Sequence, residues 1–139
     1  MKIVVVDGMG GGMGKSIIEH IRSEFKDAYI MAVGTNSIAT SVMLKAGATN
    51  GATGENAVVF NCAKADYIIG VIGILIANSM HGEVSPRMAE AVSTSVAHRI
   101  LIPVEKCGTT VLGLSEKTVQ SYISQINKVL KIQLTKSKY

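Results

Sequence analysis

The spacing of apolar and polar residues along the chain predicts strands and helices in alternation. Uninterrupted aliphatic or β-branched runs suit strands that are buried on both faces of a parallel sheet. Such runs fall at Ile3–Val6, Tyr29–Val33, Tyr67–Ile72 and Arg99–Val104, and Thr109–Leu114 is expected to add a fifth, shorter strand. The chain therefore predicts several short strands that each end in glycine or small polar residues.

Helical segments are expected between these strands. From Gly14 onward, apolar residues recur at helical spacing, at Met13, Ile17, Ile18, Ile21 and Phe25. A second helix is expected to begin near Thr35–Ser37, because these residues are good N-caps. It runs through Lys45, and Gly47 is a plausible C-terminal stop.

The second half of the chain offers two further helix starts. Ser85 precedes Pro86, an N-cap followed by proline at the first helical position, and this helix is expected to run to about Ala97. Ser115 is expected to cap a final amphipathic helix. The other connections are expected to be a polar loop at Thr49–Asn56, a segment of ambiguous period at Ala57–Ala63 and a short apolar helix near Ile74–Met80.

Alternating strands and helices indicate a parallel sheet that is covered by helices on both faces. We expect an α/β fold, a three-layer Rossmann-like sandwich with a mostly parallel sheet of four or five strands. Counting the strands in the order given above, right-handed crossovers favour a strand order near 3-2-1-4-5. The length of 139 residues suits one domain over residues 1–139, with a basic C-terminal tail from about residue 132.

Composition argues against several classes of protein. Apolar residues make up 47% of the chain and charged residues 17%, which is the reverse of the pattern that keeps a chain disordered. The same composition fits a surface partly covered by self-association as well as it fits a small buried sheet. We expect a homo-oligomer, a homodimer in the simplest case.

The charge and the apolar runs narrow the choice of partners. The net charge of +4 equals the four lysines near the C-terminus, which are Lys128, Lys131, Lys136 and Lys138. Apart from Tyr139 no aromatic residue lies among them, which disfavours nucleic acid as a partner. The apolar run Tyr67–Ala77 is too short to span a bilayer, and the two cysteines form no CxxC pair. We expect a cytoplasmic protein without a membrane partner.

The most informative segment joins the first strand to the first helix and reads Asp7-Gly8-Met9-Gly10-Gly11-Gly12-Met13-Gly14-Lys15-Ser16. A helix N-terminus presents unpaired N–H groups, and glycines let a phosphate approach the backbone closely. Five glycines are more than a tight turn needs. The main-chain N–H groups of Gly10–Lys15 are expected to hold the phosphate of a nucleotide. The cofactor-binding residues expected in this loop are Gly8, Gly10, Gly11, Gly12, Met13, Gly14, Lys15 and Ser16.

Three glycine motifs can be compared with this segment. The dinucleotide pattern GxGxxG fails, because Met13 stands at its third glycine in the Gly8 frame. The P-loop pattern GxxxxGK[ST] matches at Gly14-Lys15-Ser16 but has Met9 at its first glycine. A P-loop also needs an acid after a later strand to orient Mg²⁺, and none is convincing here.

The third pattern, GxxxGxG, fits completely with Gly8, Gly12 and Gly14. In this respect the segment resembles the cofactor loop of the short-chain dehydrogenase family. The resemblance covers roughly the first 25 residues and implies binding of a nucleotide cofactor. The Tyr-x-x-x-Lys of that family follows none of Tyr29, Tyr67 and Tyr122, so the resemblance does not extend to the reaction.

Other strand ends should meet the loop at the same edge of the sheet. The second strand normally ends in an acid that binds the adenine ribose, but here Thr35 and Asn36 occupy that place and would face the ribose. Gly70 and Gly73 would pass beneath the rest of the cofactor. No arginine lies near Thr35, so NAD and NADP stay equally open, with ATP as the alternative.

Few residues offer acid–base chemistry. His81 and Glu83 match the H-x-E of zinc deaminases, but the second cysteine of their P-C-x-x-C motif is absent after Pro103, so no metal site is expected. The two residues remain possible acid–base groups, although a polar loop is the better interpretation. Glu55 is more simply a helix-start acid. Cys107 is either a thiol at the site or a buried filler, and no catalytic residue is assigned.

Over most of its length the sequence also resembles a compact bacterial family of unknown function with Rossmann-like character. The resembling stretches are Asp7–Lys15, Val33–Ala48, Gly51–Val58, Gly70–Pro86 and Ile100–Val104. This resemblance implies the fold and no activity. The leading hypothesis is therefore a nucleotide-binding protein of NAD(P) type. The alternatives are an ATP-binding switch that uses Lys15 and Ser16, and a non-catalytic interaction domain that keeps only the fold.

Overall fold

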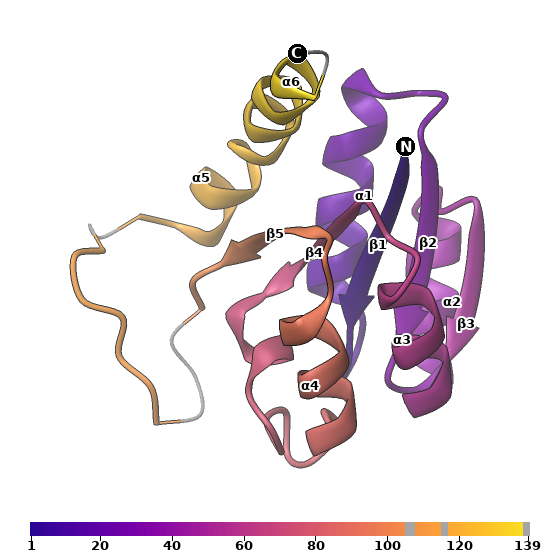
Figure 1. The fold of residues 1–139 in the computed structure, drawn as a ribbon, viewed down its shortest axis with the longest axis vertical. Helices are drawn as coiled ribbons and strands as arrows, with labels where there is room; N and C mark the ends of the chain where they lie inside the picture. The colour runs from indigo at the N-terminus through magenta and orange to yellow at the C-terminus, as the bar shows by residue number, and fades with distance from the viewer. Residues whose placement is uncertain (105–107, 115–116, 138–139) are drawn as a thin grey trace.

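The computed structural model describes residues 1–104, 108–114 and 117–137. Within them, five parallel strands form one sheet in the order β3-β2-β1-β4-β5. The strands are β1 (Lys2–Asp7), β2 (Tyr29–Gly34), β3 (Asn50–Thr53), β4 (Tyr67–Val71) and β5 (His98–Ile102). The three-layer α/β prediction is confirmed (Figure 1).

Helices cover both faces of the sheet and enclose two apolar core clusters (Figure 1). One cluster contains residues of α1 (Gly12–Glu24), α2 (Ser37–Lys45), α5 (Val119–Ile123) and α6 (Ile126–Lys136). The other contains residues of α3 (Glu55–Cys62), the 3₁₀ turn η1 (Ile72–Leu75) and α4 (Pro86–Thr94). Ile3 and Val5 belong to the first cluster, and Val4 and Val6 to the second. The two-residue period of an extended chain thus explains why β1 is apolar on both faces.

The sheet contains one strand that the pattern of residues did not predict and lacks one that it did. Asn50–Thr53, expected to be loop, is the edge strand β3 and pairs with Met31–Gly34 of β2. Its residues are polar or small and mostly exposed, so it carries no apolar run that could signal a strand. Thr109–Leu114, expected to be the fifth strand, is irregular and largely exposed, so it has no core against which a strand could pack.

This exchange changes what the expected strand order means. The observed order has the same numbers as the expected one, but the numbers refer to different strands. Strand 3 is now Asn50–Thr53, and residues 109–114 are not a strand. Tyr67–Val71 was expected beside the second strand, and it instead pairs with β1 through Ile3, Val4 and Val5. The sheet is also entirely parallel rather than mostly parallel.

The helix starts follow their caps closely. Asn36 caps α2 by accepting from the N–H of Ala39, and Ser85 caps α4 by accepting from the N–H of Met88. The ambiguous segment Ala57–Ala63 is helical: it lies in α3 up to Cys62, and Ala63 is the C-cap. The helix expected near Ile74–Met80 is only the 3₁₀ turn η1.

The C-terminal parts of the helical predictions need correction. Helix α4 ends at Thr94 rather than about Ala97. The final helix is divided into α5, which Thr118 caps, and α6, which continues to Lys136 through much of the expected basic tail. The cap expected at Ser115 lies outside the described residues.

The direction of the connections reverses beside β1. From β1 the chain passes through α1 to β2 on one side, and from β4 it passes through α4 to β5 on the other. The two loops that leave β1 and β4 therefore separate at their carboxyl ends. Such a switch point is where open parallel sheets form a crevice for ligands.

Substitution of the glycines at the start of α1 tests how closely this helix packs against its neighbours. A Cβ on Gly14 would overlap the side chain of Met43 and come within 3.0 Å of the Asp7 Cβ, whereas a Cβ on Gly12 would meet no atom within 4 Å. We expect Gly14→Ala to lower the free energy of unfolding by about 1–3 kcal/mol, as overpacking does. Gly12→Ala should leave it within about 0.5 kcal/mol of the unmodified protein. Urea unfolding of both variants checks this, and equal stabilities would contradict the close packing.

Candidate functional site at the carboxyl edge of the sheet

The glycine loop forms a tight turn between β1 and α1. The N–H of Gly11 donates to the carbonyl of Gly8 at 3.0 Å, and Gly11 has a left-handed backbone with φ of 76°. Only glycine adopts this conformation without strain, and the Cα of Ala39 lies 2.8 Å from where a Cβ would stand. The helix then begins at Gly12, two residues before the expected position.

A buried carboxylate lies under this turn. Asp7, at the end of β1, is 5% exposed. One of its oxygens accepts from the N–H of Gly8 at 2.8 Å, and the other accepts from the N–H of Gly14 at 2.7 Å. Burial raises the pKa of Asp7, and the two main-chain hydrogen bonds oppose that rise. Asp7 was expected only as the first residue of the loop, and its capping role was not predicted.

A second carboxylate, that of Glu83, contacts the loop from a distant part of the sequence. Glu83 lies in the segment between η1 and α4, and its Oε1 accepts three hydrogen bonds. The donors are the N–H of Met9 at 2.9 Å, the Oγ1 of Thr35 at 2.7 Å and the Nδ2 of Asn36 at 2.7 Å. Glu83 therefore joins the ends of β1 and β2 to the segment between η1 and α4 in one network.

These contacts determine the state of Glu83 and the roles of its partners. The hydrogen bond from Met9 lowers the pKa of the Glu83 carboxyl, and the donors on Thr35 and Asn36 lower it further. Asn36 also donates to the carbonyl of Met9 at 2.9 Å, while its Oδ1 caps α2. Thr35 and Asn36 thus lie where they were expected, beside the glycine loop, but their polar atoms are engaged by Glu83.

The glycine loop retains unpaired donors. Among the described residues, none accepts a hydrogen bond from the N–H groups of Gly10, Gly12 and Met13. Gly10 and Gly12 are exposed, and a Cβ on either would meet no atom within 4 Å. Lys15 is exposed in the first turns of the same helix, and Ser16 is half-buried. These N–H groups can donate hydrogen bonds to an anion at the positive end of the helix dipole.

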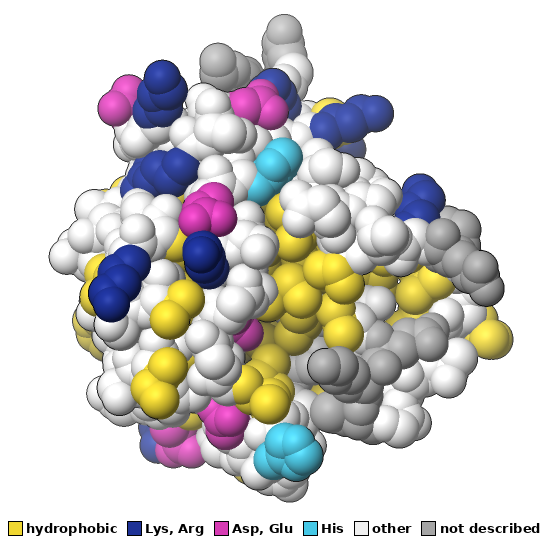
Figure 2. Space-filling view, turned by 180° about the vertical axis from the view of Figure 1, so that it is seen from behind, with side chains coloured by type: hydrophobic (Ala, Val, Ile, Leu, Met, Phe, Trp, Pro, Cys, Tyr) yellow, Lys and Arg dark blue, Asp and Glu magenta, His cyan; other side chains and the backbone are white. Residues whose placement is uncertain are grey.

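An apolar pocket of about 450 Å³ adjoins the loop at the switch point. Its lining residues are Met9, Val71, Gly73, Asn78, Ser79, Met80, His81 and Val104. Val71 and Val104 also pack against the first core cluster. Seen from the back of the molecule, apolar side chains gather in a hollow in the middle of the surface (Figure 2). The pocket is large enough for a heterocyclic ring system.

The backbone around this pocket is strained. Four non-glycine residues in the described chain have positive φ, and they are Met9, Asn78, Met80 and His81. All four line the pocket. A left-handed backbone costs a non-glycine residue of order 1 kcal/mol, and such residues concentrate at functional sites. The strained residues therefore lie at the same site that the switch point of the sheet indicates.

The remaining predicted site residues are divided. Gly73 lines the pocket, but Gly70 is buried within β4, where a Cβ would stand 2.8 Å from the carbonyl oxygen of Val6. Glu55 begins α3 and accepts from Ser85 at 2.6 Å, as expected for a helix-start acid. His81 lines the pocket, whereas Cys107 lies outside the described residues.

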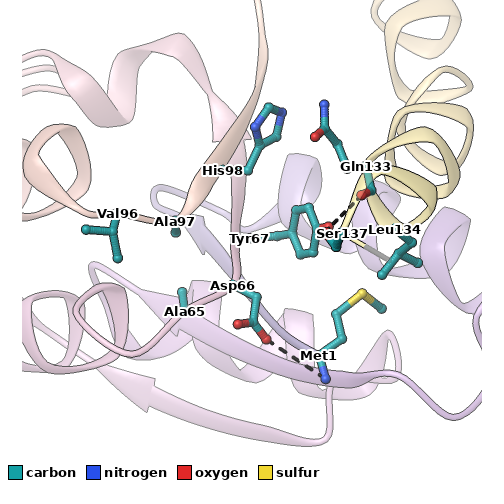
Figure 3. Close-up of a pocket in the computed structure, with 10 residues that line it drawn as sticks. All are labelled: Met1, Ala65, Asp66, Tyr67, Val96, Ala97, His98, Gln133, Leu134 and Ser137. Atoms are coloured by element: carbon teal, nitrogen blue, oxygen red, sulfur yellow. Dashed lines mark hydrogen bonds and ion pairs between the residues drawn. The ribbon is translucent and has the colours of Figure 1, made fainter. Parts of the chain in front are cut away.

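A second cavity, of about 460 Å³, lies at the opposite edge of the sheet. Its walls include Met1, Asp66, Tyr67 and His98 (Figure 3). The main-chain N–H of Lys2 donates to Asp66 at 2.6 Å, and the terminal amine of Met1 lies 3.9 Å from the same oxygen. The Asp66 carboxylate is thus already paired. The cavity lies at the amino ends of the strands, where parallel sheets rarely bind ligands. We therefore place the candidate site at the carboxyl edge.

The fold and this crevice define a Rossmann-like α/β protein with a glycine-rich loop at the switch point of its sheet. A family described as "Domain of unknown function (DUF3842)" matches residues 2–135, nearly the whole chain. The chain belongs to this family, which confirms the resemblance inferred from the sequence.

Other comparisons are distant. No curated protein matches the chain significantly. One solved structure of similar fold is the dodecameric FMN-dependent UbiX-like decarboxylase from Escherichia coli O157:H7. It shares 16% identity, the match covers 94% of this chain and 76% of that one, and the TM-score is 0.45. In the part of the chain that the structure describes, no helix has both the length and the apolar character to cross a membrane.

The Asp7 carboxylate should stabilise the loop. In Asp7→Asn the amide nitrogen would face a main-chain N–H and leave it unpaired, at a cost of about 1–3 kcal/mol. We expect the free energy of unfolding to fall by this amount in urea at neutral pH. A variant as stable as the unmodified protein would contradict the capping role.

The contribution of Glu83 should depend on pH. Since the folded state lowers its pKa from the ordinary 4.5, the stabilisation is complete above that value and is lost as pH falls through the lowered pKa. We expect the stability difference between the protein and Glu83→Gln to be constant near neutral pH and to shrink in acid. Unfolding measured from about pH 3 to pH 7 checks this, and a difference that grows in acid would contradict it.

Proposed function

We propose that this protein binds a nucleotide-type cofactor, of NAD type, in the crevice between the glycine loop and the end of β4. The observation that carries the proposal is the meeting of two complementary surfaces at the switch point. One is the set of unpaired N–H groups on Gly10, Gly12 and Met13, and the other is the apolar pocket that adjoins Met9. The first suits phosphate and the second suits a flat ring.

The charges around the loop favour one kind of phosphate. Asp7 and Glu83 both accept hydrogen bonds from the loop backbone, so they offset part of the helix dipole. A terminal phosphate carries up to two negative charges at neutral pH, and these carboxylates would repel it more strongly than a phosphodiester, which carries one. The pyrophosphate of a dinucleotide consists of two such diesters. This comparison supports a dinucleotide over ATP or a mononucleotide.

Each part of the loop would then have a distinct role. The N–H groups of Gly10, Gly12 and Met13 bind the pyrophosphate, and the exposed Lys15 offsets charge at the rim. Met9, Val71, Met80 and Val104 enclose the ring. Self-association remains a prediction.

The first test is thermal unfolding against NAD, NADP, FMN, FAD, and ATP with and without Mg²⁺. A ligand at a hundred times its dissociation constant adds about 2.7 kcal/mol of stability, and we expect a dinucleotide to produce that shift. An ATP response that needs Mg²⁺ and disappears in Lys15→Ala would support the ATP switch instead. If no nucleotide shifts the transition, the proposal fails and the interaction domain becomes the better hypothesis.

Gly12→Asp tests the anion site directly. Asp in the first turn of a helix is favourable by about 0.3–1 kcal/mol, and the position has open space, so the variant should fold at least as well as the unmodified protein. Its carboxylate would repel the pyrophosphate, and we expect the ligand-induced shift to disappear. Gly12→Asn, of nearly equal size and without charge, should keep most of the shift. Undiminished binding by Gly12→Asp would contradict the assignment.

A further inference from the structure

The end of β2 lacks the acid that a dinucleotide-binding fold normally carries there. That acid accepts hydrogen bonds from the hydroxyls of the adenine ribose. In this chain β2 ends at Gly34, and Thr35-Asn36-Ser37 follows. From the sequence alone, the ribose would have only hydroxyl and amide groups to meet.

The structure brings a carboxylate to this place from another part of the chain. Glu83 is 47 residues from Asn36 in sequence, yet its Oε1 lies 2.7 Å from the Asn36 Nδ2. It is also 3.2 Å from the position of a Cβ on Gly8. The carboxylate therefore stands between the first glycine of the loop and the end of β2.

The contacts of Glu83 are one-sided. The three donors on Met9, Thr35 and Asn36 all reach Oε1. Among the described residues, no hydrogen-bond donor reaches Oε2. Glu83 is half-buried rather than enclosed, so a ligand has access to it. A carboxylate fixed by one oxygen, with the other unoccupied, is prepared to accept hydroxyl hydrogens.

We propose that Glu83 is the ribose-binding acid of this protein, that its Oε2 accepts hydrogen bonds from the ribose hydroxyls, and that it selects a free 2′-hydroxyl over a 2′-phosphate. Thr35 and Asn36 are positioning residues, which act on the ribose through Glu83. This inference rests on the proposed function and makes it more specific, because it assigns the cofactor as NAD rather than NADP.

The selectivity follows from charge. The donors that hold Oε1 keep Glu83 ionised, since they lower its pKa. A 2′-phosphate would place a second anion against this carboxylate. No lysine or arginine takes part in the hydrogen bonds that join Glu83 to Met9, Thr35 and Asn36, and NADP sites commonly supply an arginine at this point.

The experiment is calorimetric titration of the full chain with NAD and NADP, which differ only at the 2′ position. We expect the unmodified protein to bind NAD at least tenfold more tightly. Glu83→Gln keeps the shape of the side chain and removes its charge, so the ratio of the two dissociation constants should fall by at least tenfold. Glu55→Gln, which neutralises another acid at a helix start, is the matched control and should leave the ratio unchanged.

The outcomes separate this inference from the proposed function. If the unmodified protein binds NAD and NADP equally, or if Glu83→Gln leaves the ratio unchanged, the role of Glu83 is overturned and nucleotide binding stands. If it binds neither, both are overturned. The ratio in the unmodified protein decides the matter even if Glu83→Gln folds poorly. If Glu83 only held the loop in place and did not contact the ribose, Glu83→Gln would change the stability of the protein but not the ratio of the two dissociation constants.

Discussion

The site depends on one interaction, the pair of hydrogen bonds from the buried Asp7 carboxylate to the N–H groups of Gly8 and Gly14. These bonds hold both ends of the glycine loop to the end of β1. They also restrict the choice of residue at position 14, because α1 can come this close to Asp7 and Met43 only without a side chain there. With the loop fixed in this way, the N–H groups of Gly10, Gly12 and Met13 lie at the carboxyl edge of the sheet without an acceptor in the described part of the chain.

Glu83 extends this arrangement across the crevice. Asp7 holds the loop to the end of β1, while Glu83 accepts a hydrogen bond from Met9 of the loop and connects it to the end of β2. The strained residues Asn78, Met80 and His81, which precede Glu83 in the chain, line the adjoining pocket. Two acids therefore shape a site whose expected ligand is itself an anion. Under the proposed function, their negative charge would favour a ligand of low charge density, a constraint that the glycine motif alone does not supply.

Much of the fold could be predicted from the sequence, because burial leaves a clear pattern. Strands β1, β2, β4 and β5 are apolar runs, and the caps Asn36 and Ser85 mark their helices. Strand β3 could not be found in this way, since an exposed edge strand needs only its main chain to pair with β2. The contacts of Glu83 could not be predicted from the sequence either. They join residues up to 74 positions apart, and no local spacing relates a residue in one loop to the ends of two other strands.

The separation between Met9 and Glu83 has a consequence for how the site comes into being. Contacts between residues far apart in sequence form late, because closing a long stretch of chain costs entropy before any contact rewards it. During synthesis the glycine loop and the first three strands emerge well before residue 83. The loop must therefore exist for a time with the N–H of Met9 unoccupied, and the crevice is completed only when the chain has crossed back to place β4 beside β1. Under the proposed function, the site could bind its ligand only after β1, β2 and β4 have come together.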